Sequence, residues 1–268
     1  MIVKRLDIER LFKDVGLQEN DPILYLGGRI DDDKLYPPKY RKYLKDKIKR
    51  LNPTKIICHN HWYAKKYYER GILSKNAKID MIFVYYNYLV DGKLQAINPT
   101  DYQDHRTWMK ILIDKNPNIV YAMYISEGHK PPAVDAREDW FTEDYDLNNI
   151  KYFSFDRKYS PPSFAHRRHG RGARDASDGF GCINQLLDSG LKNLNIIGFS
   201  AFGSDEDMSY HSEYDCNGDK RFLGRKLFDL NTSEDLRTES DIMKHWAQTK
   251  KITNLENHSK LLDALEEK

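Results

Sequence analysis

The stretch Ile23-Leu24-Tyr25-Leu26-Gly27-Gly28-Arg29 decides the fold. Four apolar residues form a run of the length expected for a buried strand, and two glycines and a cation end it. Further runs rich in β-branched and aromatic residues predict more strands. These are Lys55–Cys58, Met81–Tyr85, Ile119–Tyr124, Ile150–Phe155 and Asn195–Gly198.

Segments with helical character separate these runs. They are Lys39–Leu51, Tyr63–Arg70, Asp101–Lys115, Phe180–Ser189, Glu239–Lys250 and a charged C-terminal helix at Glu256–Glu267. Strands that alternate with helices predict an α/β fold with a doubly wound, mostly parallel sheet. We expect one domain over residues 1–268, with a C-terminal helical segment at about 237–268 and long loops at 127–149 and 160–177 that are typical of lids or binding loops.

The composition excludes several classes of protein. The 268 residues are 40% hydrophobic and 31% charged, which is enough apolar material for a core and argues against disorder. The three cysteines, Cys58, Cys182 and Cys216, have no metal-type spacing and indicate a reducing compartment. No apolar run reaches the roughly 18 residues of a membrane span, so we expect a cytoplasmic protein, bacterial or from a virus-infected cell, without a membrane partner.

Small or hydrogen-bonding residues follow the predicted strands. Parallel sheets bind ligands at the carboxyl ends of their strands, where the strand order reverses, so we expect a ligand site among these residues. They are Gly27, Gly28 and Arg29 after the first strand, His59, Asn60 and His61 after the second, Asn87 after the third, and Gly198, Phe199 and Ser200 at the last.

Basic residues are concentrated in two segments, although 43 Lys and Arg nearly balance 41 Asp and Glu overall. Residues 36–70 hold eleven Lys or Arg against two acidic residues, and residues 151–174 hold seven against one. Guanidinium groups bind phosphate oxygens in a bidentate manner, which predicts a phosphate or nucleic-acid contact in the second segment. Its candidate residues are Arg167, Arg168, Arg171 and Arg174.

The common nucleotide and hydrolase motifs are missing from the sequence. It has no Gly-rich loop followed by Lys and Ser or Thr, no G-x-G-x-x-G after the first strand, no G-x-S-x-G and no H-E-x-x-H. The triplet Asp205-Glu206-Asp207 has the spacing of an acidic site for Mg²⁺ or Mn²⁺, with Asp205 and Asp207 as ligands. We expect no required cofactor and keep this metal site as the alternative.

One segment carries a family resemblance. It runs from Ser177-Asp178-Gly179-Phe180-Gly181 through Gly190 to Leu194-Asn195-Ile196-Ile197-Gly198-Phe199-Ser200-Ala201-Phe202. This segment resembles the small motif of the sialyltransferase-like glycosyltransferases, in which a Ser/Thr-Gly turn opens a helix and a short strand ends in a glycine and an aromatic residue. A further echo places Gly27-Gly28, Asn60 and Asp80 with Asn87 at family elements. The resemblance implies a Rossmann-like, glycosyltransferase-type fold with a loop or helical lid.

The resemblance also implies an activity, which is sugar transfer from a UDP- or CMP-sugar donor to an acceptor hydroxyl, with inversion. Ser177, Gly179 and Phe180, with the residues at the strand ends, would hold the donor. His211 would be the base, with Glu213 or Asp215 orienting it. The acceptor is a glycan or, as in certain phage enzymes, a hydroxymethylated DNA base. The alternative is a nucleic-acid-binding protein without catalysis that uses the two basic segments.

Overall fold

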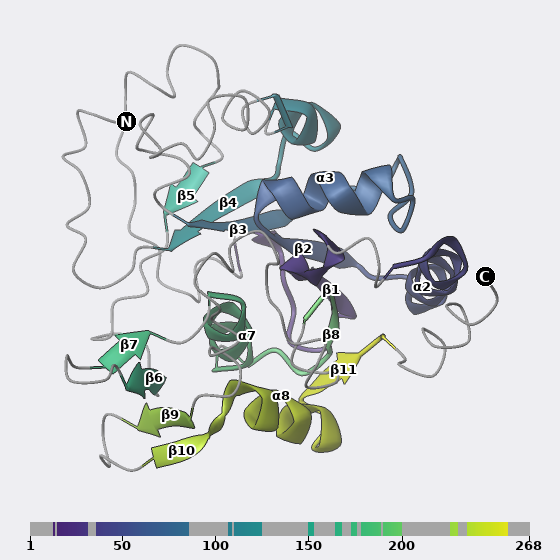
Figure 1. The fold of residues 1–268 in the computed structure, drawn as a ribbon. Helices are drawn as coiled ribbons and strands as arrows, with labels where there is room; N and C mark the ends of the chain where they lie inside the picture. The colour runs from purple at the N-terminus through teal and green to yellow at the C-terminus, as the bar shows by residue number, and fades with distance from the viewer. Residues whose placement is uncertain are drawn as a thin grey trace, which may run out of the picture.

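The computed structural model describes residues 13, 15–31, 36–85, 107–108, 110–124, 150–152, 164–167, 173–175, 178–188, 190–199, 226–229 and 235–256. Strands and helices alternate at the start of this chain and again near its end (Figure 1). The elements of the central layer and its two coverings are β1 (Ile23–Leu26), η1 (Gly28–Asp31), α2 (Pro38–Leu51), β2 (Lys55–His59), α3 (His61–Glu69), β3 (Met81–Tyr85), β4 (Val120–Tyr124), β5 (Ile150–Tyr152), α7 (Asp178–Asp188), β8 (Leu194–Ile197), α8 (Glu239–Gln248) and β11 (Ile252–Asn254).

Seven strands form one sheet in the order β11-β8-β1-β2-β3-β4-β5, and every neighbouring pair is parallel. The first strand, β1, lies in the interior of the sheet, and β2 to β5 follow on one side of it. It then returns to the other side of β1 to place β8 and β11. The parallel α/β sheet that the sequence predicted is therefore confirmed, and the order of strands reverses between β1 and β8.

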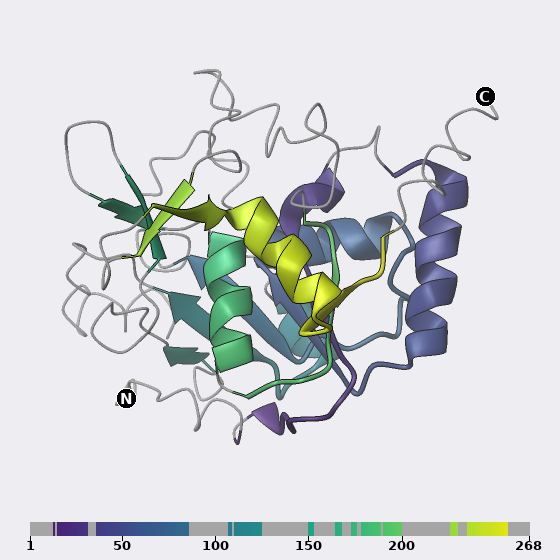
Figure 2. The same cartoon turned by 90° about the horizontal axis from the view of Figure 1, so that it is seen from below.

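Helices cover both faces of this sheet, as a doubly wound fold requires (Figures 1 and 2). In β1, Leu24 and Leu26 join the hydrophobic cluster on the face covered by α2 and α3, which also takes in Leu112 from the helical residues 110–115. Ile23 and Tyr25 join the cluster under α7 and α8. A parallel sheet covered on both faces has strands that are apolar throughout, and all four residues of β1 are buried.

Local sequence explains where α2 begins and ends. Pro38 opens it, a position where the missing N–H would have had no helical partner. Asn52 ends it in the left-handed conformation at φ 47°, and its N–H donates to the Ile48 carbonyl at 3.0 Å. Tyr40, Leu44 and Ile48, each four residues apart, form the face that packs on the sheet.

A second, antiparallel sheet has the order β10-β9-β6-β7 and was not expected from the sequence. It consists of β6 (Phe164–Arg167), β7 (Ala173–Asp175), β9 (Lys226–Asp229) and β10 (Asp235–Thr238). The expectation of a plain loop over 160–177 is wrong, because β6 and β7 pair as antiparallel strands within it. The sequence also missed β11, which lies inside the segment expected to be helical at 237–268.

The sequence also led to expectations about the cysteines, membrane-spanning helices and two further segments. Cys58 and Cys182 are buried in different clusters on opposite faces of the sheet. In the part of the chain that the structure describes, no helix is long and apolar enough to span a membrane. The predicted loop at 127–149 and nearly all of the predicted helix at Glu256–Glu267 lie outside the described residues.

Candidate functional site

The reversal of strand order places the carboxyl ends of β1 and β8 next to each other. Leu26 of β1 pairs with Ile197 of β8, and the next residue, Gly27, donates its N–H to the Ile197 carbonyl at 2.7 Å. Gly198 follows Ile197 directly. Open α/β sheets bind their ligands at such a reversal, outside the carboxyl ends of the strands. The structure thus brings together Gly27, Gly198 and Phe199, three residues that the sequence assigned to one site.

The two glycines are required because protein atoms fill the space where side chains would stand. A Cβ on Gly27 would clash with the Gly198 carbonyl and would lie 2.8 Å from the Phe199 ring. Gly198 has φ +83°, and a Cβ there would clash with the Tyr67 hydroxyl. Glycine alone combines this backbone conformation with so close an approach.

Tyr67 of α3 ties the two strand ends together. Its hydroxyl is 3.1 Å from the Gly27 carbonyl and 3.2 Å from the Ile197 carbonyl, so the O–H donates to the ends of both strands. The side chain is fully buried, and burial raises the pKa of Tyr67 well above its usual value. The phenol therefore stays protonated and remains a donor. This role was not predicted from the sequence.

Glu256, two residues beyond β11, holds the turn at Gly198 from another side. Its Oε2 accepts the Gly198 N–H at 3.1 Å, and its Oε1 accepts the hydroxyl proton of Tyr36 at 2.6 Å. Tyr36 is buried and lies just before α2. One carboxylate thereby links the chain after β8, the chain after β11 and the start of α2.

The beginning of α7 lies against the same strand ends. A Cβ on Gly179 would come within 3.1 Å of the Phe199 ring, so this glycine also leaves room for a protein group. Phe180 is 2% exposed and stacks on Trp246 of α8 with ring centroids 5.1 Å apart, which makes it a core residue. Gly181 differs, because among the described residues no atom outside its own helix lies within 4 Å of a Cβ built there. The helix start is thus open at Gly181 and closed at Gly179.

The end of β2 is connected to β1 through aromatic side chains. Asn60 has φ 68° and caps α3, since its Oδ1 accepts the Trp62 N–H at 2.9 Å. His59 is buried, with its Nδ1 3.2 Å from the Tyr25 hydroxyl, and its ring stacks on Tyr63. A Cβ on Gly28 would lie 2.6 Å from that Tyr63 ring. Both residues therefore have structural roles at the carboxyl ends of β1 and β2: Gly28 leaves room for Tyr63, and Asn60 caps α3.

The other predicted site residues are distributed as follows. Arg29 lies in η1, while Arg167 ends β6 and Arg174 lies in β7, opposite His166. The two arginines are thus on paired antiparallel strands. The predicted residues that lie outside the described part of the chain are Asn87, Arg168, Arg171, Ser177, Ser200, Asp205, Asp207, His211, Glu213 and Asp215.

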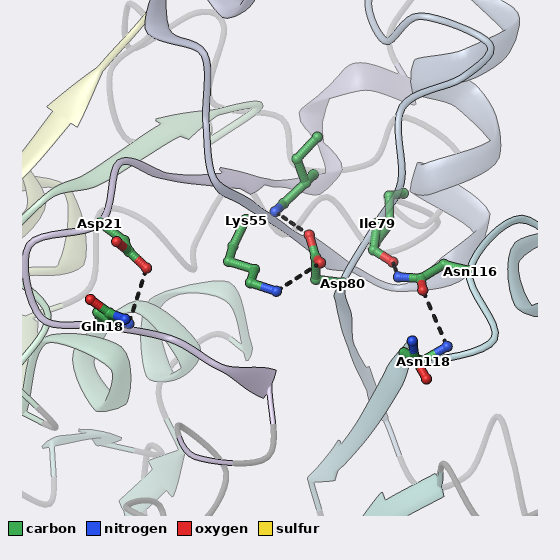
Figure 3. A network of polar contacts seen from close by, with 8 residues as sticks. Gln18, Asp21, Lys55, Ile79, Asp80, Asn116 and Asn118 are labelled. Carbon is green, nitrogen blue, oxygen red and sulfur yellow. Dashed lines mark hydrogen bonds and ion pairs between the residues drawn. The ribbon is translucent and has the colours of Figure 1, made fainter.

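Asp80, which the resemblance placed at a family element leading into the third strand, lies at the amino end of β3, and Figure 3 shows its polar contacts. It precedes β3, its Oδ2 accepts the Ile56 N–H at 2.9 Å, and its Oδ1 is 3.3 Å from the Lys55 ammonium. These contacts join β2 and β3 at their amino ends. Asp80 is therefore a structural residue of this fold.

Among the described residues, no group of three or more His, Cys, Asp or Glu side chains is arranged to hold a metal ion. Comparisons with protein-family models, with curated proteins and with solved structures found no match. The fold and the strand-end geometry are therefore the basis for a functional assignment. They define the class: a doubly wound parallel α/β protein with a glycine-lined strand reversal.

Proposed function

We propose that the protein is a nucleotide-sugar-dependent glycosyltransferase whose donor binds at the carboxyl ends of β1, β2 and β8. The main support for the proposal is that the strand order reverses between β1 and β8. The start of α7 packs against Phe199, just beyond the end of β8. Nucleotides bind at such reversals in open α/β sheets, with phosphate groups at a helix N-terminus. The resemblance of residues 177–202 to a donor-binding motif supports the same location.

The helix start suits a phosphate for two reasons. The first N–H groups of α7 have no acceptor within the helix, and its dipole places partial positive charge there. No described residue beyond α7 itself would meet a Cβ at Gly181, so the described part of the chain leaves the backbone of the first helical turn accessible to a ligand there. Arg167, Arg168, Arg171 and Arg174 are the cations proposed to meet the leaving phosphate.

The reaction needs a base as well as a phosphate site. A bond forms between the acceptor oxygen and the anomeric carbon, while the bond from that carbon to the phosphate oxygen breaks. The base takes the acceptor proton, and the nucleotide departs as a phosphate anion. We assign the base to His211, oriented by Glu213 or Asp215, and direct displacement gives inversion.

The test is nucleotide release from a panel of UDP-, CMP- and GDP-sugars, measured with glycan acceptors and with hydroxymethylated duplex DNA. With a donor that supports turnover, His211→Ala should lower kcat by about 10²–10⁴-fold and leave donor affinity nearly unchanged. His245→Ala, an exposed histidine of α8, is the matched control and should behave as wild type.

Glu213→Gln and Asp215→Asn identify the orienting carboxylate, and EDTA tests the alternative metal site at Asp205 and Asp207. Release of nucleotide from none of the donors would overturn the proposed function. Normal turnover of His211→Ala would remove the histidine from the role of base.

A further inference from the structure

The helix α2 carries an unusual concentration of positive charge. Seven of its fourteen residues are Lys or Arg and one is acidic. The basic residues are Lys39, Arg41, Lys42, Lys45, Lys47, Lys49 and Arg50, and the acidic residue is Asp46. Both views of the fold show α2 at the periphery of the molecule (Figures 1 and 2).

These cations surround the whole solvent side of α2. The buried residues Tyr40, Leu44 and Ile48 define the side that packs on the sheet. Lys42 and Lys49 are exposed on the opposite side together with Asp46, the one acidic residue. The remaining cations lie between the two sides, with Arg41 and Lys47 half-buried on the flanks. Positive charge therefore extends from one flank of α2 across its exposed face to the other.

Helix stability does not explain this arrangement. Lys39 stands in the first turn, which contains no acidic residue, and a cation there opposes the helix dipole. Arg41 with Lys45, and Lys45 with Lys49, are like charges four residues apart, a spacing that costs about 0.2–0.5 kcal/mol per pair. Only Lys49 and Arg50, in the last turn, favour the dipole. Asp46 makes favourable pairs with Lys42 and Arg50 at the same spacing, which offset these costs without turning them into a net gain. The excess of cations thus brings the isolated helix no clear stability and indicates an anionic partner.

The opposite helical layer provides a comparison. The segment α7 contains two Asp and no Lys or Arg, and α8 contains Glu239 and Asp241 against Lys244. Among these three helices, the excess of positive charge is therefore confined to α2, whereas the formal net charge of the whole protein is only +2. A partner recognised by charge would bind the α2 side.

We propose that α2 is a binding element for the phosphate backbone of duplex nucleic acid. Cations on both flanks suit a ligand that surrounds a helix on three sides, and the major groove, about 12 Å wide, admits an α-helix. Fourteen residues give a rod of about 21 Å. A flat anionic bilayer would contact only the cations farthest from the sheet. It would also find no apolar face to bury, because Tyr43 and Leu51, the other apolar residues of α2, pack against the core.

This inference goes beyond the proposed function and does not depend on it, because binding needs neither donor nor catalysis. It also locates the nucleic acid relative to the candidate site. Tyr36, two residues before α2, donates to Glu256, and Glu256 accepts the Gly198 N–H. One end of a duplex lying along α2 would therefore come near the carboxyl ends of β1 and β8.

The experiment measures binding of the full chain to a fluorescent 20-base-pair duplex over a series of salt concentrations. The test variant replaces four exposed lysines of α2, Lys39, Lys42, Lys45 and Lys49, by Gln. The control variant makes the same charge change at four exposed lysines elsewhere, Lys75, Lys78, Lys244 and Lys251. A third variant replaces the four α2 lysines by Arg. Circular dichroism confirms that each variant is folded.

We expect the slope of log Kobs against log salt to decrease in magnitude by about three to four in the test variant, since each phosphate contact contributes about 0.9. The control and Arg variants should keep the wild-type slope. Equal slopes in all four proteins, or equal losses in the test and control variants, would overturn the proposal. So would α2-dependent binding to phosphatidylserine vesicles without binding to the duplex, which would assign α2 to an anionic membrane.

Discussion

The two ends of the parallel sheet are held together in different ways. At the amino ends, polar side chains bond to the backbone: Asp80 accepts from Ile56, and Asn116 donates to the Ile79 carbonyl at 2.9 Å (Figure 3). At the carboxyl ends of β1 and β8, glycines bring the two backbones into direct contact, and Tyr67 and Glu256 hold them from neighbouring elements. Polar side chains bond to the backbone at both ends, but only the carboxyl ends also require glycines that leave room for direct contact between the two strands.

The largest effect should come from adding one methyl group at the carboxyl ends. Gly198→Ala places a Cβ at φ +83° and against the Tyr67 hydroxyl. Strain in the left-handed region costs about 1–2 kcal/mol and overpacking about 1–3 kcal/mol more. We expect a loss of about 3 kcal/mol in the free energy of unfolding, measured with urea.

Gly190→Ala is the matched control for that substitution. Gly190 has φ +96°, but no atom of the described residues lies within 4 Å of a Cβ built there. It therefore tests backbone strain without the clash and should cost about 1–2 kcal/mol. An equal loss in both variants would show that the close approach of β1 and β8 contributes nothing.

At the amino ends, Asp80→Ala should cost about 2 kcal/mol. It leaves the Ile56 N–H without its acceptor, and an unsatisfied buried donor costs about 1–3 kcal/mol. Lys55→Gln removes the other partner of Asp80, but this ion pair is partly exposed, so we expect at most about 1 kcal/mol. Urea unfolding of the two single variants and the double variant separates the contributions. A larger loss from Lys55→Gln than from Asp80→Ala would contradict this account.

Much of the fold could be predicted because its signals are local. The runs Ile23–Leu26 and Met81–Tyr85 are apolar throughout, and both strands have the predicted bounds. The antiparallel sheet gave no such signal. Its strand β6 has the sequence Phe-Ala-His-Arg and pairs with β9, about sixty residues away, so pairing rather than local pattern determines it.

The candidate site could also be predicted only in part from the sequence. The glycines at the strand ends could be found, because small residues after strands are visible in the sequence. Tyr67 was missed because its spacing from Tyr63 and Ala64 is that of an ordinary core stripe. Glu256 was missed because its partners, Gly198 and Tyr36, lie 58 and 220 residues away in the chain.

Glu256 gives a prediction of intermediate size at the carboxyl ends. Glu256→Ala removes the acceptor of both the Gly198 N–H and the Tyr36 hydroxyl, and should cost about 1–2 kcal/mol in urea unfolding. Glu256→Gln should restore most of that loss, because the amide oxygen can accept from Gly198 while its NH₂ group donates to Tyr36. If Gln and Ala destabilised the protein equally, the bridge between the strand end and α2 would not explain the effect.

The smallest expected change in stability has the opposite sign and bears most directly on function. Gly181 lies in the first turn of α7, where no described atom would meet a Cβ, and Ala is preferred over Gly inside a helix by about 0.5–1 kcal/mol. Packing therefore gives no reason for this glycine, in contrast to Gly27, Gly28, Gly179 and Gly198. Gly181→Ala should raise the urea midpoint slightly. If a donor phosphate approaches the helix start, the same variant should weaken donor binding, because the methyl group would occupy the approach. Higher stability with unchanged donor affinity would place the donor away from Gly181.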